Sequence, residues 1–311
     1  MTTTTTASDA APRCFLAASI IAAFFLQGSR ALAQEANAGS DSLNRGKRFI
    51  EVQRIEAAEP EILKAVELRP DDPEAQYSLG YIRFRQGRLE ESRKLFLRVL
   101  ELDRSHRKAH MKLGLIEART GNVAGAERTF AALVKADPED PLARKNHGGA
   151  LRDLGRFDEA RAELEKALEL APEYSDAHHA LGILESKLGN RKAALARHQR
   201  AIELDPAHVD AWNQVGVILS RAGKTQEAIE HFVRATALDP GYVTARMNLA
   251  EAHRKLNRND LAIAELERVR ALDPRHPKVH AKLAEVYELS GRTADAARAR
   301  AAQTALVTES R

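Results

Sequence analysis

The sequence predicts an all-α fold built as an array of stacked helical hairpins. The main observation is a two-residue motif, Leu-Gly or a close substitute, that returns every 34 positions without insertion or deletion. A fixed period of this length indicates one small structural unit whose copies bury their apolar faces against their neighbours. The motif occurs at Leu79-Gly80, Leu113-Gly114, His147-Gly148, Leu181-Gly182, Val215-Gly216, Leu249-Ala250 and Leu283-Ala284.

Three further positions repeat with the same period, counted in frames that begin seven residues before the motif's second residue. Position 15 is Gly in six frames and Asn257 in the other, and position 20 is Ser92 or Ala. Position 32 is Pro in every frame except the one with Arg104. This pattern closely resembles the tetratricopeptide repeat (TPR). The fullest match is the frame that contains Trp212, Val215-Gly216, Ala228, Phe232, Ala235 and Pro240.

Periodicity within a frame predicts two helices. Apolar residues at positions 3, 7, 10 and 14 follow the 3.6-residue spacing of one helical face. The Gly or Asn at position 15 then ends the first helix, and Pro closes the second. We interpret the Gly inside the first helix, opposite the recurring Ala of the second, as allowing a close approach of the two backbones. The first apolar face is exemplified by Ala177, Leu181, Leu184 and Leu188.

The frames define the expected domain organisation. We expect a linker over residues 34–38 and a degenerate N-terminal repeat over 39–72, which has Gln53 at the turn and Pro60 in its second helix. Six repeats follow over 73–276, and a C-terminal repeat with a capping helix over 277–311. The resemblance implies that these repeats form a right-handed TPR superhelical solenoid.

Residues 1–33 have the pattern of a secretory signal peptide. An apolar run from Cys14 to Leu26 follows Arg13, and a small-residue site ends at Ala33. The run is too short for a comfortable membrane span. We therefore expect cleavage after Ala33, a periplasmic or secreted protein and no stable membrane insertion after cleavage; an uncleaved N-terminal anchor is the alternative. Cleavage would remove Cys14, the one cysteine.

The remaining chain offers no pattern for catalysis or for a cofactor. The repeats use nearly every residue after Gly39, and we find no phosphate-binding Gly loop, nucleophile elbow or metal-ligand spacing. Two histidine pairs at i, i+4 have the spacing of metal ligands, but each straddles the entry into a first helix without a third ligand, so we expect no metal site there. A net charge of +4 gives no electrostatic signature for nucleic acid. The pairs are His106 with His110 and His276 with His280.

The resemblance to TPR proteins implies a concave groove lined by positions 2, 5, 6, 9, 12 and 13 of the first helices. Position 13 is basic in five of seven frames, and aromatic residues occupy the N-terminal end of the groove. The carboxylate clamp of chaperone-binding TPR domains is not matched, because Gly149 and Ala180 replace its two Asn residues. The predicted groove residues are Tyr77, Tyr81, Phe84, Arg85, Lys112, Arg119, Lys145, Asn146, Lys187, Asn213, Arg221, Asn248 and Lys255.

These observations predict a non-enzymatic scaffold or adaptor of the bacterial cell envelope, which binds an acidic or extended segment of a protein partner in its groove. In a plainer interpretation the basic residues are ordinary solvated faces. A different class of function is structural self-assembly, in which terminal repeats stack into homo-oligomers.

Overall fold

A computed structural model describes residues 34–309 of the chain. Every regular element in this range is an α-helix, and short turns join neighbouring helices. The predicted fold class, an all-α repeat solenoid, is therefore confirmed. The leader expected over residues 1–33 lies outside the described residues.

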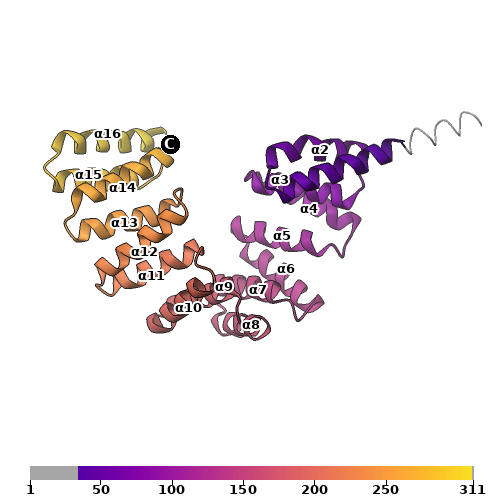
Figure 1. The fold of residues 1–311 in the computed structure, drawn as a ribbon, viewed down its shortest axis with the longest axis horizontal. Coiled ribbons are helices and arrows are strands. Elements are labelled where there is room, and N and C mark those ends of the chain that lie inside the picture. The colour runs from indigo at the N-terminus through magenta and orange to yellow at the C-terminus, as the bar shows by residue number, and fades with distance from the viewer. Residues whose placement is uncertain (1–33, 310–311) are drawn as a thin grey trace, which may run out of the picture. The chain divides into compact units, whose positions relative to one another are not determined.

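The helices divide into two compact units, one ending at Leu133 and the other beginning at Val134, within helix α6. The described part of the first unit begins with a helix over residues 34–51, so the segment 34–38, expected as a linker, is helical. Its hairpins lie side by side in chain order (Figure 1). The further helices are α2 (Ile55–Leu68), α3 (Pro73–Arg85), α4 (Leu89–Leu102), α5 (Arg107–Arg119) and α6 (Val123–Ala136).

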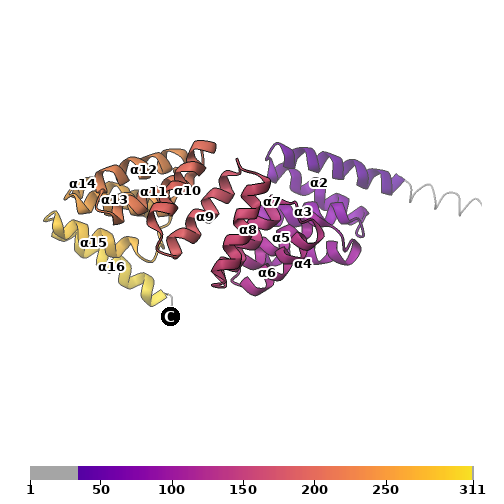
Figure 2. The ribbon, with the colours of Figure 1, turned by 90° about the horizontal axis from the view of Figure 1, so that it is seen from below.

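The second unit repeats the same pattern. The first helix of a repeat has 13 residues in most cases and the second has 14, with a longer last helix of 17 residues. Figure 2 shows these hairpins from a second direction. The helices are α7 (Pro141–Asp153), α8 (Phe157–Leu170), α9 (Ser175–Lys187), α10 (Arg191–Leu204), α11 (Val209–Arg221), α12 (Thr225–Leu238), α13 (Val243–Lys255), α14 (Asn259–Leu272), α15 (Val279–Leu289) and α16 (Thr293–Glu309).

The turn inside each hairpin uses a left-handed backbone conformation at position 15. Gly87 has φ +75°, and glycine adopts this conformation without a Cβ penalty. Gln53 and Asn257 hold the same conformation with φ 60° and 56°. The degenerate N-terminal repeat therefore keeps the turn geometry of the others, and its second helix, α2, continues through Pro60.

Where a first helix has glycine at position 8, that glycine faces the side chain at position 24 of the second helix. A Cβ on Gly80 would lie 2.8 Å from the Phe96 ring, and one on Gly216 would lie 2.6 Å from the Phe232 ring. Both rings are almost fully buried. The space that the glycine leaves is therefore filled mainly by the side chain at position 24. Position 20 also lies close, because a Cβ on Gly148 would be 3.1 Å from the Ala160 carbonyl oxygen. This packing fixes the separation of the two helices in a hairpin.

No helix of the described range has both the length and the apolar composition needed to cross a bilayer. The apolar core is divided into clusters that join neighbouring helices. One such cluster, around Ile62 and Ile82, holds α2 against α3, and another, around Leu266 and Leu283, holds α14 against α15. Each repeat thus depends on the repeats beside it.

Candidate functional site

In the first unit, three aromatic side chains and three cationic side chains share one surface. Tyr77, Tyr81 and Phe84 are four and three residues apart on α3, so they lie on one face of the helix. All three are half-buried, which leaves part of each ring open to solvent. We call this surface the aromatic–basic strip; it consists of Tyr77, Tyr81, Phe84, Arg85, Lys112 and Arg119.

The cations of the strip lie close to the rings. Lys112 Nζ is 5.2 Å from the ring centroid of Tyr81 and 5.0 Å from that of Phe84. The guanidinium carbon of Arg119 is 4.7 Å from the Phe84 centroid. Arg85 Nη1 donates a hydrogen bond to the Tyr81 hydroxyl at 3.0 Å. Cation–π contacts contribute about 0.5–1 kcal/mol each at exposed sites, so they position these cations without neutralising them.

Among residues 34–309, no carboxylate forms an ion pair with Arg85, Lys112 or Arg119. Burial lowers the pKa of Lys112 below its usual value, and Arg119 and Arg85 act in the same direction. A half-buried ammonium without a counter-charge is stabilised when an anion approaches. The strip is therefore suited to hold negative charge beside an apolar ring face.

A pocket of about 280 Å³ adjoins the strip. Ile50, Tyr77 and Tyr81 form its apolar wall, and the space fits one large side chain. Glu74 at its edge is already engaged, because its carboxylate accepts a hydrogen bond from Lys47 Nζ at 2.8 Å, and this bond lowers the pKa of Glu74. The full lining is Lys47, Ile50, Glu51, Glu74, Tyr77, Ser78, Tyr81, Lys108 and Lys112.

All the residues that line this pocket stand at the repeat positions expected to face the groove. Lys47, Ile50 and Glu51 were missing from the predicted set because they belong to the degenerate repeat 39–72. Extending the same position rule into that repeat would have found them, and Lys108 stands at position 2 of its own frame.

In the second unit, the predicted groove residues lie on successive first helices, and most already have partners there. Lys187 Nζ is 3.6 Å from Asp153 Oδ1. Lys145 Nζ is 4.0 Å from Asp176 Oδ2, and burial lowers the pKa of Lys145. Asn146 is buried in α7. The basic charge of this surface is thus partly neutralised.

Two amides of the second unit bond to each other. Asn248 Nδ2 donates to Asn213 Oδ1 at 2.9 Å, and Lys255 Nζ donates to the Ser220 hydroxyl at 3.2 Å. Arg221 is exposed at the end of α11 and forms no ion pair within the described residues. The structure thus gathers six of the predicted residues in the aromatic–basic strip and spreads the other seven along the second unit.

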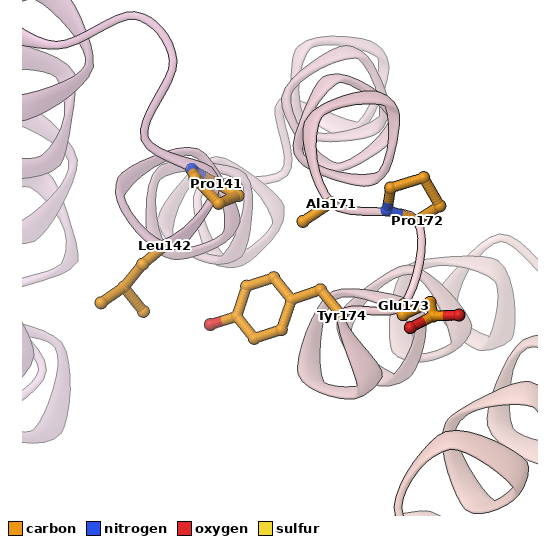
Figure 3. A pocket seen from close by; sticks show the side chains of 6 residues that line it. All are labelled: Pro141, Leu142, Ala171, Pro172, Glu173 and Tyr174. Carbon is orange, nitrogen blue, oxygen red and sulfur yellow. The ribbon is translucent and has the colours of Figure 1, made fainter.

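The second unit also has a pocket of about 640 Å³ that the sequence analysis missed. Figure 3 shows the Tyr174 ring reaching toward Leu142, while the Glu173 carboxylate points away from the ring. Its walls are mostly apolar, so it offers few groups that could orient a ligand. The lining is Pro141, Leu142, Ala171, Pro172, Glu173 and Tyr174.

The two histidine pairs at i, i+4 form hydrogen bonds with the backbone. His106 Nδ1 accepts a hydrogen bond from the Ala109 N–H at 3.2 Å, and His280 Nε2 donates to the Pro274 carbonyl at 2.9 Å. Across residues 34–309, no group of three or more His, Cys, Asp or Glu side chains is placed to hold a metal ion.

The solved structures that match include two that share this fold over most of the chain. A tetratricopeptide repeat protein from Parabacteroides merdae ATCC 43184 has a TM-score of 0.66 at 15% identity, covering 80% of this chain and 99% of that one. A chain of the APC/C hetero-tetramer Cut9-Hcn1 has a TM-score of 0.64 at 21% identity, covering 86% of this chain and 51% of that one. MamA is 24% identical, with a TM-score of 0.45 and coverage of 52% and 95%. No match was found among curated proteins.

Family models agree with the repeat pattern along most of the chain. One tetratricopeptide repeat model matches residues 43–106, 92–141, 111–175, 145–185 and 179–243, and another matches 219–285. These matches cover the repeats on both sides of the boundary between the units. The chain therefore belongs to the tetratricopeptide repeat family.

Proposed function

We propose that this protein is a non-enzymatic interaction scaffold that binds an extended, acidic segment of a partner protein along the aromatic–basic strip of its first unit. TPR proteins generally mediate protein–protein interaction, and the TPR fold is typically a non-enzymatic scaffold. The family supports the class of function. The choice of surface and of partner chemistry depends on the strip.

The observation that carries the proposal is the absence, among the described residues, of carboxylate partners for Arg85, Lys112 and Arg119. Their positive charge is held in place by aromatic rings and remains available to a ligand. Charge complementarity then favours an acidic segment, which would associate faster and more selectively than a neutral one. In the second unit, by contrast, Lys187 already has Asp153 as its partner.

The adjoining pocket adds a second requirement. A segment that runs along α3 can place one bulky apolar side chain against Ile50, Tyr77 and Tyr81. Buried aromatic anchors of this kind supply much of the affinity of an interface, and the surrounding charges set its selectivity. The expected recognition element is therefore an apolar or aromatic residue flanked by Asp or Glu.

A random peptide library displayed on phage tests this proposal. We expect panning against the purified chain to enrich peptides with acidic residues around one large apolar residue. Panning against the double variant Lys112→Glu/Arg119→Glu should lose the acidic enrichment, whereas Arg221→Glu, an exposed cation of the second unit, should keep it. Enrichment that is unchanged in the double variant, or that shows no acidic bias with the wild type, would reject the strip as the binding surface.

The proposed place of action is the bacterial cell envelope, which rests on the leader pattern of residues 1–33. Self-assembly through the terminal repeats remains the alternative role. Its contact surface would include α16, where exposed Arg298 and Arg300 pair with Asp295 and Glu288 of the same chain. These ion pairs offer little of the apolar contact on which stable homo-oligomers depend, so the exposed Leu289 and Val307 of this repeat would have to supply it.

A further inference from the structure

Three histidine rings meet inside the second unit, away from the aromatic–basic strip. His179 lies on α9, His198 on α10, and His208 directly before α11. The ring centroids of His179 and His198 are 4.9 Å apart, and those of His179 and His208 are 4.6 Å apart. His198 is fully buried. We call these three residues the histidine cluster.

Several ring nitrogens in the cluster are buried without a hydrogen-bond partner. Both nitrogens of His198 and the Nδ1 of His179 are buried without a hydrogen bond. By comparison, His178 Nε2 donates to the Pro172 carbonyl at 3.0 Å. His208 is better satisfied, because its Nδ1 accepts from the Ala211 N–H at 3.3 Å. No hydrogen bond is therefore in place to stabilise an imidazolium at His198.

The repeat pattern explains why His198 is so confined. It stands at position 24, where other repeats have buried rings such as Phe96, Phe130 and Phe232. A Cβ on Gly182 would lie 2.6 Å from the His198 ring, so the ring fills the same slot against the first helix. The titratable side chain of His198 thus occupies a buried position that holds an apolar ring in other repeats.

The charges around the cluster do not compensate for this burial. Lys145 and Arg152 of α7 add positive charge near His179, and Asp176 of α9 supplies negative charge. Asp176 is itself shared, because its carboxylate lies 3.4 Å from His208 Nε2 and 4.0 Å from Lys145 Nζ. The groups that act on His198 are His179 and His208.

We propose that the histidine cluster makes the α9–α10 hairpin an acid-sensitive joint, whose local opening becomes more favourable as the pH falls below about 6.5. The residues from 34 to 309 provide no set of ligands for a metal ion, so protonation is the chemistry that this cluster offers. The inference does not depend on what the strip of the first unit binds.

The direction of the effect follows from where protons bind. Burial lowers the pKa of His179 and of His198 to about 3, from an ordinary value of 6.5. The open form binds protons below pH 6.5 and the closed form does not, so the stability of the closed form is complete above pH 6.5 and declines as the pH falls toward 3. At pH 5 His179 and His198 each favour opening by a factor of about 30, and the two together by about a thousand.

Hydrogen–deuterium exchange of the full chain at pH 7.5 and 5.0 tests the joint, with rates corrected for the pH dependence of chemical exchange. We expect protection of α9 and α10 amides to fall at least about a thousandfold more than that of α3 and α4, a hairpin without histidine (residues 73–102). His178 on α9, whose pKa burial also lowers, adds to this loss. Most carboxylates stay ionised at pH 5, so the comparison isolates the imidazoles. Equal losses in the two hairpins would overturn the proposal.

The variant His198→Phe restores the ring type found in other repeats and should reduce the extra loss of protection by a factor of roughly thirty. His276→Gln, which changes a partly exposed histidine elsewhere in the unit, should leave the thousandfold loss unchanged. An unaltered pH response in His198→Phe would contradict the inference. Should that variant fold poorly, imidazole NMR of the wild-type chain decides the matter: His179 and His198 should remain neutral at pH 5, and a midpoint near 6.5 for both would reject the cluster.

Discussion

The guanidinium of Arg119 stacks on the Phe84 ring, with its central carbon 4.7 Å from the ring centroid. This contact joins α5 to α3 across two successive repeats and fixes a positive charge beside an apolar face. Because the guanidinium has no carboxylate partner among the described residues, the contact creates a surface that favours an anionic ligand.

Replacing either of two glycines in first helices with Ala should change the stability of the second unit in opposite directions. Gly216→Ala should destabilise the second unit by about 1–3 kcal/mol, because its Cβ would lie 2.6 Å from the Phe232 ring. Gly149→Ala should stabilise it by up to about 1 kcal/mol, because no atom lies within 4 Å of its Cβ and Ala is the better helix former. Thermal unfolding followed by circular dichroism measures both, and a lower melting temperature for Gly149→Ala would contradict this view of the packing.

The turn of the degenerate repeat offers a second test of local geometry. Gln53 holds a left-handed conformation with φ 60°, which costs a non-glycine residue about 1 kcal/mol. Gln53→Gly should therefore raise the stability of the first unit, and Gly87→Ala, the reverse change at the next turn, should lower it by a similar amount. Urea denaturation of the two variants provides the comparison. If both variants changed the free energy of unfolding in the same direction, the two turns would not be equivalent.

An ion pair between adjacent hairpins predicts a pH-dependent mutant effect. Arg161 of α8 donates a hydrogen bond to the buried Glu185 carboxylate of α9, and this bond keeps the pKa of Glu185 below its usual value. The pair therefore stabilises the fold above pH 4.5, and its contribution is lost as the pH falls below that value. Glu185→Gln should cost about 1–3 kcal/mol at pH 7, and its difference from wild type should shrink at pH 4. Urea titrations at both pH values check this, with the exposed Glu173→Gln as the control expected to show no change at either.

The export prediction concerns residues outside the described range. If the leader is removed after Ala33, the mature protein begins at Gln34. Intact-mass analysis of the protein from its native host would then give the mass of residues 34–311. A membrane-bound form that retains Met1 would favour the uncleaved anchor.

The repeat signature predicted the helices well because each recurring residue ends a helix through its own backbone preference. Gly at position 15 ends the first helix by its left-handed conformation, and Pro at position 32 follows the end of the second. The repeat signature did not predict the helix at residues 34–38, which extends upstream of the first repeat, 39–72. There the 34-residue period gives no information, since no preceding repeat constrains the start.

The candidate site was only partly predictable. The period identifies groove neighbours, because residues about 34 positions apart lie on adjacent first helices, as Lys187 and Asp153 do. The period does not show which side chains make contact. The sequence therefore could not distinguish Lys187, which has a carboxylate partner, from Arg119, which has none among the described residues. The histidine cluster escaped notice for a related reason: His179, His198 and His208 occupy different frame positions, and only the packing of three elements unites them.

The central claim is that the strip of the first unit binds an acidic segment. Its most direct test is the affinity of a fluorescent acidic peptide, selected on the wild-type chain, for three proteins over a range of salt concentrations. We predict that wild-type binding weakens with salt, that Lys112→Glu/Arg119→Glu weakens it by roughly ten- to a hundredfold, and that Arg221→Glu matches wild type. Equal binding by the wild type and the double variant, without salt dependence, would contradict the account.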